Sequence, residues 1–291
     1  MSLRSMEVSP KYFNKSQLKF YVILIPVAIF MLLPVVFIFS QALKPLDELF
    51  LFPPRFLVQK PTLKNFTDLF RAASGTGVPM TRYLFNSIVI TVVAIVATLV
   101  ITTSTGYALS KKNFKGKNFI FKLNQTALMF VAIAVIIPRY LVIDALGLND
   151  SFFVHVIPYL AMPVGLFLVK QFIDQVPDEL IEAAKIDGAN DFHILFLIII
   201  PLIKPALATV AILTFQFIWN STESSNIYII TETKKTFSFY LTTLTSNQVV
   251  SIAGAGMAAA AALIMFVPNL AIFIILQGQV MDTMSHSGIK Q

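Results

Sequence analysis

The sequence predicts an all-α integral membrane protein with six transmembrane helices and a polar helical segment between the fourth and the fifth. Hydrophobic residues make up 56% of the 291 residues and charged residues only 13%, and the mean hydropathy is +0.77. A soluble domain of this length would need a more charged surface. The apolar residues also come in long blocks, several of which reach the roughly 20 residues that cross about 30 Å of hydrocarbon.

The long apolar blocks define the predicted spans, within a single transmembrane domain covering residues 1–291. The first span is too long for a cleaved signal peptide, whose apolar core is shorter. Prolines inside the first span should kink it, and Pro138 should interrupt the third. The polar stretches 44–82 and 231–255 are expected to be loops. The six spans are predicted at 20–43, 84–109, 119–143, 152–173, 205–230 and 256–277.

Lysine and arginine indicate the orientation of the chain in the bilayer. Lys11, Lys15 and Lys19 precede the first span, and a second group of lysines crowds the short turn at 111–117 between spans two and three. Basic residues near span ends favour the cytoplasmic side. An even number of spans places both termini and that turn on the same side, so we expect both termini in the cytoplasm. The location expected is the inner membrane of a bacterial cell, in contact with membrane lipid.

Several chemistries are excluded or disfavoured by composition. The chain has no cysteine, so it forms no disulfide and has no cysteine-ligated metal or thiol nucleophile. Its three histidines are far apart and are interpreted as structural. The net charge is +7, and the basic residues flank apolar blocks. This placement suits contact with anionic lipid headgroups rather than with nucleic acid. No phosphate-binding Gly-x-x-x-x-Gly-Lys-Ser/Thr loop occurs. We therefore expect no enzyme, no metal and no cofactor on this chain.

The segment 174–204 is polar, yet it has the pattern of a helix. Pro177 suits a helix start, Asp178 and Glu179 suit the first turn, and Gly188 suits a C-terminal turn. The apolar stripe would consist of Leu180, Ile181 and Ala184. An amphipathic helix could lie on the membrane. Its polar face is acidic, however, with Asp178, Glu179, Glu182 and Asp187, and an acidic face better fits a basic groove on a protein partner.

This segment resembles the EAA signature of ATP-binding-cassette importer permeases. The matching residues are Glu182, Ala183, Ala184, Gly188, Ile198, Ile200 and Pro201, with Ile200 where leucine is usual. Further resemblance to six-span permeases of the maltose-transporter type, in the carbohydrate-uptake class, lies in Phe85-Asn86-Ser87, Gly106-Tyr107-Ala108-Leu109-Ser110, Trp219-Asn220 and Ser287-Gly288-Ile289-Lys290. The tail, residues 281–290, is similar to a branch associated with oligosaccharides and pectin- or uronate-type sugars.

The resemblance implies a division of labour among several subunits. A second homologous permease would pair with this chain, and a cytoplasmic ATPase dimer would bind ATP and Mg²⁺. An extracytoplasmic binding protein would deliver the sugar, touching the segment 231–255. The signature helix would couple ATPase closure to the transport path. The resemblance assigns Glu182, Ala183, Ala184, Asp187 and Gly188 to this coupling.

The transport path is predicted from a polar stripe in the fifth span. Gln216, Trp219, Asn220 and Glu223 are spaced as one face of a helix. Polar groups at membrane depth usually face a bundle interior or a water-filled cavity. Amides, a carboxylate and an aromatic ring together suit a sugar. The same stripe could instead make hydrogen bonds to the partner permease.

Two other functions remain open from sequence alone. A permease of the same superfamily could carry amino acids, peptides or an oxyanion, because its signature loop would look alike. A stand-alone secondary carrier would show charged residues buried within spans and would have no use for an acidic docking helix. A membrane enzyme is disfavoured because no nucleophile–base or metal constellation is visible.

Overall fold

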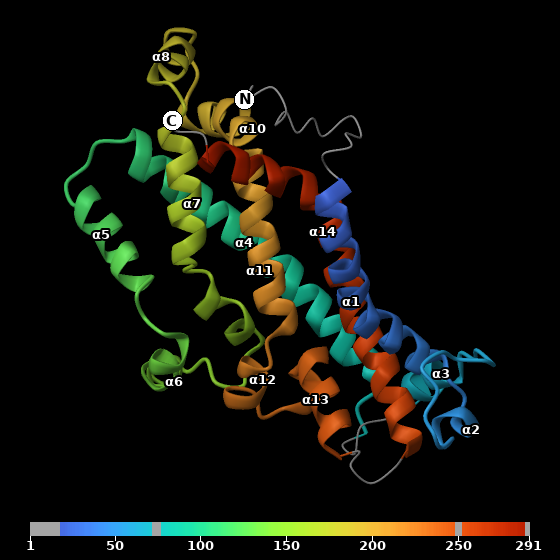
Figure 1. Cartoon of the computed structure of the whole chain (residues 1–291). Coiled ribbons are helices and arrows are strands. Elements are labelled where there is room, and N and C mark those ends of the chain that lie inside the picture. Colours follow the sequence, from blue (N-terminus) through green and yellow to red (C-terminus); the bar gives the residue numbers. More distant parts are fainter. Residues whose placement is uncertain (1–17, 72–76, 248–251, 289–291) are drawn as a thin grey trace. The chain divides into compact units, whose positions relative to one another are not determined.

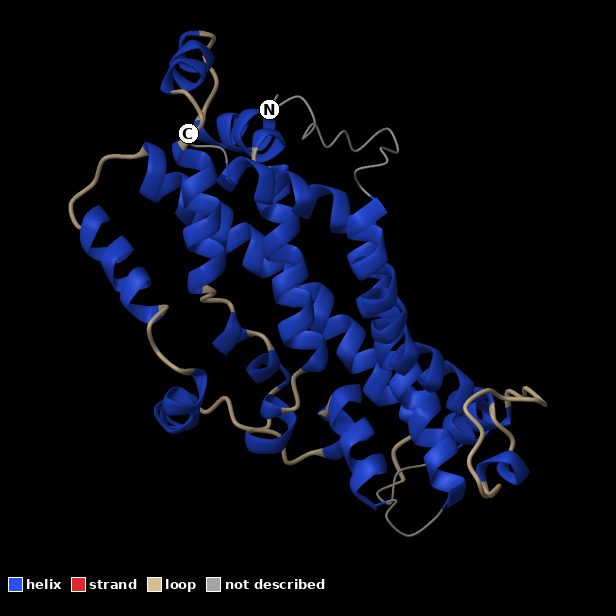
Figure 2. Ribbon diagram, viewed as in Figure 1, coloured by secondary structure: helices blue, strands red, loops and turns tan. Residues whose placement is uncertain are grey.

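The computed structural model describes residues 18–71, 77–247 and 252–288. Helices dominate this part of the chain, and no strand occurs in it (Figures 1 and 2). Lys11 and Lys15, on which the orientation prediction partly depends, and Ile289 and Lys290 of the tail lie outside the described residues. The all-α prediction is confirmed.

The helices follow one another with short connections. The 3₁₀ segments are labelled η, as is one π-helical segment, η6. The elements are α1 (Leu18–Leu43), α2 (Leu46–Leu49), α3 (Lys64–Arg71), α4 (Met80–Lys111), α5 (Lys117–Ala127), η3 (Ala132–Val135), α6 (Ile136–Ala145), η4 (Phe152–His155), η5 (Ile157–Tyr159), α7 (Pro163–Asp174), α8 (Asp178–Ile186), α9 (Asp191–His193), η6 (Ile194–Ile199), α10 (Ile200–Leu202), α11 (Lys204–Asn220), α12 (Glu223–Ile227), η7 (Glu232–Lys234), α13 (Phe237–Asn247) and α14 (Ile252–Gly288).

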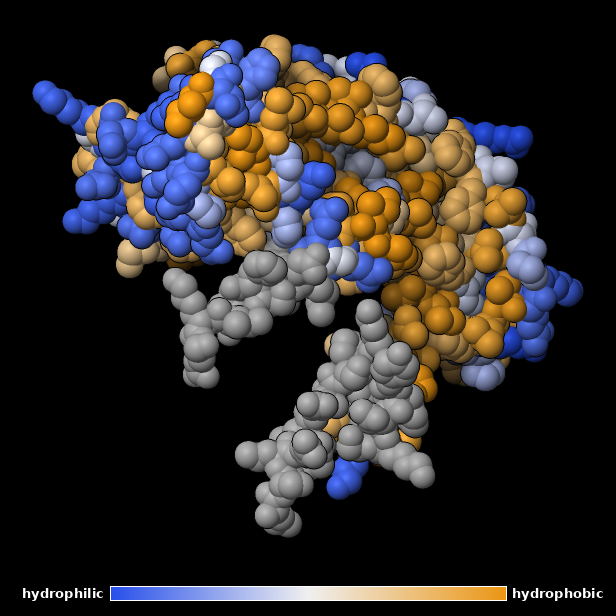
Figure 3. All heavy atoms as spheres, turned by 90° about the horizontal axis from the view of Figure 1, so that it is seen from above, coloured by the Kyte–Doolittle hydropathy of each residue, from blue (hydrophilic) through white to orange (hydrophobic). Residues whose placement is uncertain are grey.

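Three helices are long and apolar enough to cross a membrane unbroken: α1, α4 and residues Gly254–Gln279 of α14. The other three candidates are bent helix pairs, with bends of 112° after α5, 47° before α7 and 83° before α11. The last of them begins at Asp191, before the start of the predicted fifth span at residue 205. Among the described residues the number of spans is therefore three, or up to six if each bent pair crosses as one. Figure 3 shows the broad areas of hydrophobic surface that such a protein presents to lipid.

Two local predictions are wrong. The break in the third span falls at residues 128–131, between α5 and η3, whereas Pro138 lies inside α6. Proline is tolerated there because the first turn of a helix has no intrahelical partner for its N–H. The segment 231–255, expected to be a loop, contains α13. Phe237 and Tyr240 are buried along this helix, and a composition rich in threonine and serine concealed their helical spacing.

The chain folds into two compact units. The first comprises Met1–Leu69 and Leu244–Ile264. Within it, the chain after α1 is tied back to the end of that helix. Asn65 Nδ2 donates to the carbonyls of Ala42 and Lys44 at 2.9 and 2.7 Å. Glu48, which is buried, accepts backbone N–H groups from Gln59 and Lys60. In its described part up to Arg71, the predicted loop 44–82 thus contains two short helices, α2 and α3.

The second unit, Phe70–Thr243 and Met265–Gln291, is built around the packing of α4, α7 and α11. Gly106 permits the close approach of α4 to α7, because a Cβ there would lie 2.9 Å from Val169 Cγ1. The buried cluster continues from these helices into the segment after α7. Its members are Tyr107, Val169, Ile173, Val176, Ile181, Ile194, Leu195, Ile199, Ile203 and Val210.

Candidate functional site

The predicted signature helix is α8, and the turn after it is built as the sequence suggests. Gly188 has φ +84°, a left-handed conformation that glycine adopts without steric cost. Its N–H donates to Lys185 O at 3.0 Å, and the N–H of Ala189 donates to Ala184 O at 2.9 Å. These bonds satisfy the last carbonyls of α8. The Gly188 turn therefore follows from backbone geometry.

The outer surface of α8 is open. Glu182, Ala183 and Asp187 are exposed, and Ala184 is partly buried. The helix is held from its other side, where Ile181 is 5% exposed and packs in the cluster shared with α7 and η6. Leu180, expected in the apolar stripe, is instead 45% exposed. A helix so placed presents small and acidic residues to a partner while its base is fixed to the bundle.

Lysines at the end of α4 tie the base of α8 to that helix. Lys111 Nζ lies 2.7 Å from Asp178 Oδ1 and donates to Val176 O at 2.6 Å. Lys112 pairs with Asp191, which follows the Gly188 turn. The neighbouring Lys111 ammonium lowers the pKa of Asp178 through a hydrogen bond and charge attraction. Asp178 is thus exposed but already paired with Lys111, so fewer acidic side chains of α8 are free than the sequence indicated.

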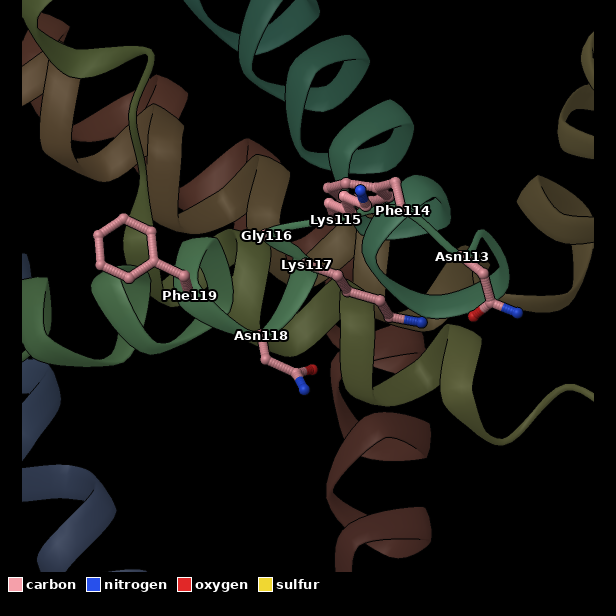
Figure 4. Close-up of a pocket in the computed structure, with 7 residues that line it drawn as sticks. All are labelled: Asn113, Phe114, Lys115, Gly116, Lys117, Asn118 and Phe119. Atoms are coloured by element: carbon pink, nitrogen blue, oxygen red, sulfur yellow. The ribbon is translucent and has the colours of Figure 1, made fainter.

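The turn between α4 and α5 forms a shallow hollow lined by residues 113–119 (Figure 4). Lys117 Nζ donates to Ser110 O at 3.1 Å, which leaves it close to the end of α4. In Figure 4 the side chain of Phe119 points away from those of Lys117 and Asn113. The side chains therefore do not converge on a ligand. This lysine-rich turn lies at the same end of α4 as α8, as the Lys111–Asp178 pair requires.

The four residues predicted for the transport path do not share one environment. The helix α11 ends at Asn220, and Glu223 opens the separate helix α12, so the predicted single helical face is wrong. A β-conformation at Ser221 ends α11. Gln216 and Asn220 are exposed, and Asn220 Nδ2 lies 3.4 Å from Asn269 Oδ1 of α14. Asn269, a half-buried residue that the sequence reasoning missed, thus joins these two amides.

Trp219 lies in the core. It is 3% exposed, its Nε1 donates to Met265 O at 3.0 Å, and its ring stacks on Phe215 with centroids 5.6 Å apart. In this conformation no open face of the indole is available to a sugar. Its hydrogen bond and stacking instead fix α11 against Met265 of α14.

Glu223 forms an ion pair that no sequence pattern predicted. Its Oε1 lies 2.8 Å from Arg139 Nη1, and the two side chains are 25% and 22% exposed. Arg139 comes from α6, within the predicted third span. The sequence signal for such a pair was Arg139 itself, because a charged residue within a membrane span is rare and is usually paired.

The side chains of Asn86 and Ser87, called the clamp below, hold the segment after α12. Asn86 Nδ2 donates to the carbonyls of Thr233 and Lys235 at 2.8 and 2.9 Å, and Ser87 Oγ accepts from Phe237 N at 2.8 Å. The Phe85-Asn86-Ser87 motif thus has a structural role.

Asp150 and His155 reinforce the clamp from a second segment. Asp150 accepts from the backbone and hydroxyl of Thr231 and from Lys234, and these bonds hold its pKa well below the usual range. His155, buried, bridges Ser224 Oγ at 2.7 Å and Lys234 O at 3.0 Å. The histidine is structural, as predicted. Figure 1 shows α12 at the end of α11 far from α8, so the clamp and α8 are at opposite ends of this unit.

A bundle of apolar helices with an exposed α8 at one end and a clamped segment at the other has the architecture of a multi-pass membrane protein. Residues 103–280 match the model of the binding-protein-dependent transport system inner membrane component, and the chain belongs to that family. It is 31% identical to the inner membrane permease YcjP of Escherichia coli K12 over 74% of this chain and 76% of that protein. It is 34% identical to the arabinooligosaccharide permease AraQ of Halalkalibacterium halodurans over 55% and 56%.

The fold has also been seen in a solved structure. A crystal structure of a bacterial transporter that imports the acidic polysaccharide alginate superimposes with a TM-score of 0.76 at 22% identity, covering 92% of this chain and 98% of that chain. At this identity the match establishes the permease fold alone. The predicted membership of the importer permeases is confirmed by the family match, and the fold by this structure.

Proposed function

We propose that this chain is one of two permease subunits of an ATP-driven importer and that it carries a saccharide. The observation that carries the proposal is the exposed α8 with its Gly188 turn, fixed to α4 through Lys111 and to the core through Ile181. A partner that grips α8 would move α4, α7 and α11 with it, because these elements share one packed cluster. That arrangement suits a transport path driven from outside the chain.

The proposed partners follow from the family and the surface. A cytoplasmic ATPase dimer, holding ATP and Mg²⁺, would receive α8 through Glu182, Ala183, Ala184, Asp187 and Gly188. The side bearing α8 and the lysine turn would be cytoplasmic, with both termini on it. A second permease and an extracytoplasmic binding protein would complete the importer, and the present chain would carry no cofactor. Residues 1–291 would form one permease domain.

The saccharide class is supported by relatives and by three amide side chains. AraQ is named for arabinooligosaccharides and the structural neighbour for alginate. Gln216, Asn220 and Asn269 offer donors and acceptors at membrane depth, which would suit sugar hydroxyls. The neighbouring open reading frames would test the class directly, since a binding protein and a second permease should be encoded beside this one.

Glu182→Lys provides the test of coupling. Glu182 and Asp47 are both exposed acids, but only Glu182 lies on α8. The complete importer, reconstituted with binding protein, should lose most sugar-stimulated ATP hydrolysis with Glu182→Lys and keep it with the matched control Asp47→Lys. Membrane insertion should be unchanged in both. Wild-type stimulation in the Glu182→Lys importer would refute the proposed coupling.

A further inference from the structure

A cavity of about 330 Å³ lies between α4, α5 and the segment that leads into α7, within the second unit. Its wall is mostly aliphatic and includes Ile101, Ile120, Leu123, Leu160 and Leu166. An apolar cavity is a poor place for water and takes up apolar groups instead. At membrane depth the group at hand is hydrocarbon.

Two polar side chains of the wall are already bonded to the protein. Thr102 Oγ1 donates to Thr98 O at 2.7 Å, and Asn124 Nδ2 donates to Pro163 O at 3.1 Å. Since these donors are directed at backbone carbonyls, the wall suits an acyl chain better than a sugar or an ion.

Lysines stand at the α8 end of this cavity. Lys117, the first residue of α5, precedes Asn124 by seven positions, so it lies on the same side of α5 about 10 Å along the helix. Its Nζ donates to Ser110 O at 3.1 Å, which bridges α5 to the end of α4. On α7, Lys170 lies beyond the cavity in the same direction and pairs with Asp174 at 2.6 Å. Figure 1 shows the start of α5 and the ends of α4 and α7 on the side of the unit that bears α8.

The positive charge at this end exceeds what nearby acids balance. Residues 111–122 contain five lysines and no acid. Two of these lysines pair with Asp178 and Asp191. The charge of Lys117 also acts on Asp178, but from beyond ion-pair distance. Within the described ranges three of the five form no ion pair: Lys115, Lys117 and Lys122.

A molecule that joins an anionic group to hydrocarbon fits both the lysines and the cavity. Basic pockets between membrane helices near the cytoplasmic surface suit acidic lipid headgroups. An ammonium has three N–H donors, and Lys117 gives one of them to Ser110 O, so two remain for phosphate oxygens.

We propose that Lys117 and this cavity form a binding site for an anionic phospholipid. The phosphate would lie at Lys117, in the leaflet on the α8 side, and one acyl chain would lie between α4, α5 and α7. The bound lipid would join α5 to the other two helices just before the chain breaks at residues 128–131.

A photoactivatable phosphatidylglycerol with a diazirine on one acyl chain tests the site in nanodiscs of phosphatidylcholine. The full chain would be purified with the subunits that accompany it, and labelled peptides would be mapped by mass spectrometry. We expect label on residues 101–105, 120–127 and 160–166. Unlabelled phosphatidylglycerol should reduce this label, whereas phosphatidylethanolamine with the same chains, which has no net charge, should not.

Charge variants test the headgroup contact. Lys117→Gln should lower the label about fivefold, the contribution of one lysine near the membrane surface. Glutamine keeps a donor for Ser110 O, and Lys117→Arg keeps the charge and should keep the label. Lys122→Gln is the matched control, because Lys122 is an exposed lysine on the opposite side of α5.

Ring insertions test the acyl-chain contact. Ala127→Phe places a ring in the cavity and should remove most of the label. Gln125→Phe places the same ring on the exposed, opposite side of α5 and should leave the label unchanged. Equal labelling of Ala127→Phe and the wild type would overturn the proposal.

Two further outcomes would also overturn it. Reduction of the label by phosphatidylethanolamine as strong as that by phosphatidylglycerol, or wild-type label in Lys117→Gln, would show that the anionic headgroup is not recognised. A wild-type protein without label on the three segments would show that a protein surface, such as the second permease, covers the cavity. None of these readouts involves sugar or ATP, so failure of the proposed import would leave them unchanged.

Discussion

Lys111 Nζ lies 2.7 Å from Asp178 Oδ1, so the last residue of α4 is bonded to the first residue of α8. The lysine side chain is 7% exposed and the aspartate 74%. The same ammonium donates to the carbonyl of Val176. A single buried lysine therefore joins a membrane-depth helix to the surface helix that is proposed to bind the ATPase.

Lys111→Met should weaken this connection more than Asp178→Asn. The methionine leaves the Val176 carbonyl without its donor, which costs about 1–3 kcal/mol. The asparagine removes only an exposed charge, and exposed ion pairs contribute little. The unfolding temperature of the purified complex should drop clearly for Lys111→Met alone. The amount of sugar transported per ATP hydrolysed should fall in the same variant. Equal effects of the two variants would show that the carbonyl bond is unimportant.

Gly188→Pro should uncouple transport from ATP hydrolysis. Proline fixes φ near −65°, whereas Gly188 has φ +84°, and proline also removes the N–H that donates to Lys185 O. Gly188→Ala should cost about 1–2 kcal/mol locally and impair coupling only in part. Gly147→Ala is the matched control, since Gly147 also has positive φ, at +65°, outside α8. Comparable uncoupling by Gly147→Ala would mean that the effect is general destabilisation.

Acid should loosen the segment held by Asp150. Thr231 and Lys234 keep the pKa of Asp150 below its unfolded value of about 3.9. Its stabilisation is therefore present above that value and is lost as the pH falls from about 5 toward the lower folded pKa. The melting temperature of Asp150→Asn should fall less between pH 6 and pH 3 than that of the wild type. Parallel curves for the two proteins would contradict this assignment.

The sequence predicted the elements that depend on local pattern and missed those that depend on distant contacts. The α8 helix and the Gly188 turn follow from spacing and backbone chemistry over a few residues. The partners of Asn86 and Arg139 are separated from them by 147 and 84 positions, and no local pattern reveals such a pairing. Helical periodicity also continues past the end of α11, which made Glu223 look like a member of the Gln216–Asn220 face.

Asn86→Ala should release the segment after α12. Asn86 is 1% exposed and donates to two carbonyls. Its loss leaves the Lys235 carbonyl unpaired, at a cost of about 1–3 kcal/mol, whereas the Thr233 carbonyl keeps the bond from Arg82 Nε at 3.2 Å. Hydrogen exchange at residues 230–237 should accelerate. Phe85→Ala, beside it but 57% exposed, should leave exchange there unchanged. Protection as in the wild type would show that Ser87, Asp150 and His155 suffice to hold the segment.

Substitutions of the adjacent residues Trp219 and Asn220 should have different effects, because we expect Trp219 to stabilise the fold and Asn220 to act in transport. Trp219→Phe removes the bond to Met265 O and some buried volume, which should lower stability by about 1–3 kcal/mol. The folded Trp219→Phe importer should keep its sugar-stimulated ATPase.

Asn220→Ala and Gln216→Ala change exposed side chains, so the thermal stability should stay the same while the sugar stimulation of the ATPase falls in a graded way. Steady-state ATPase with and without loaded binding protein, alongside thermal unfolding, measures both effects. The reverse pattern would place the indole on the path, which requires Trp219 to leave the core during transport.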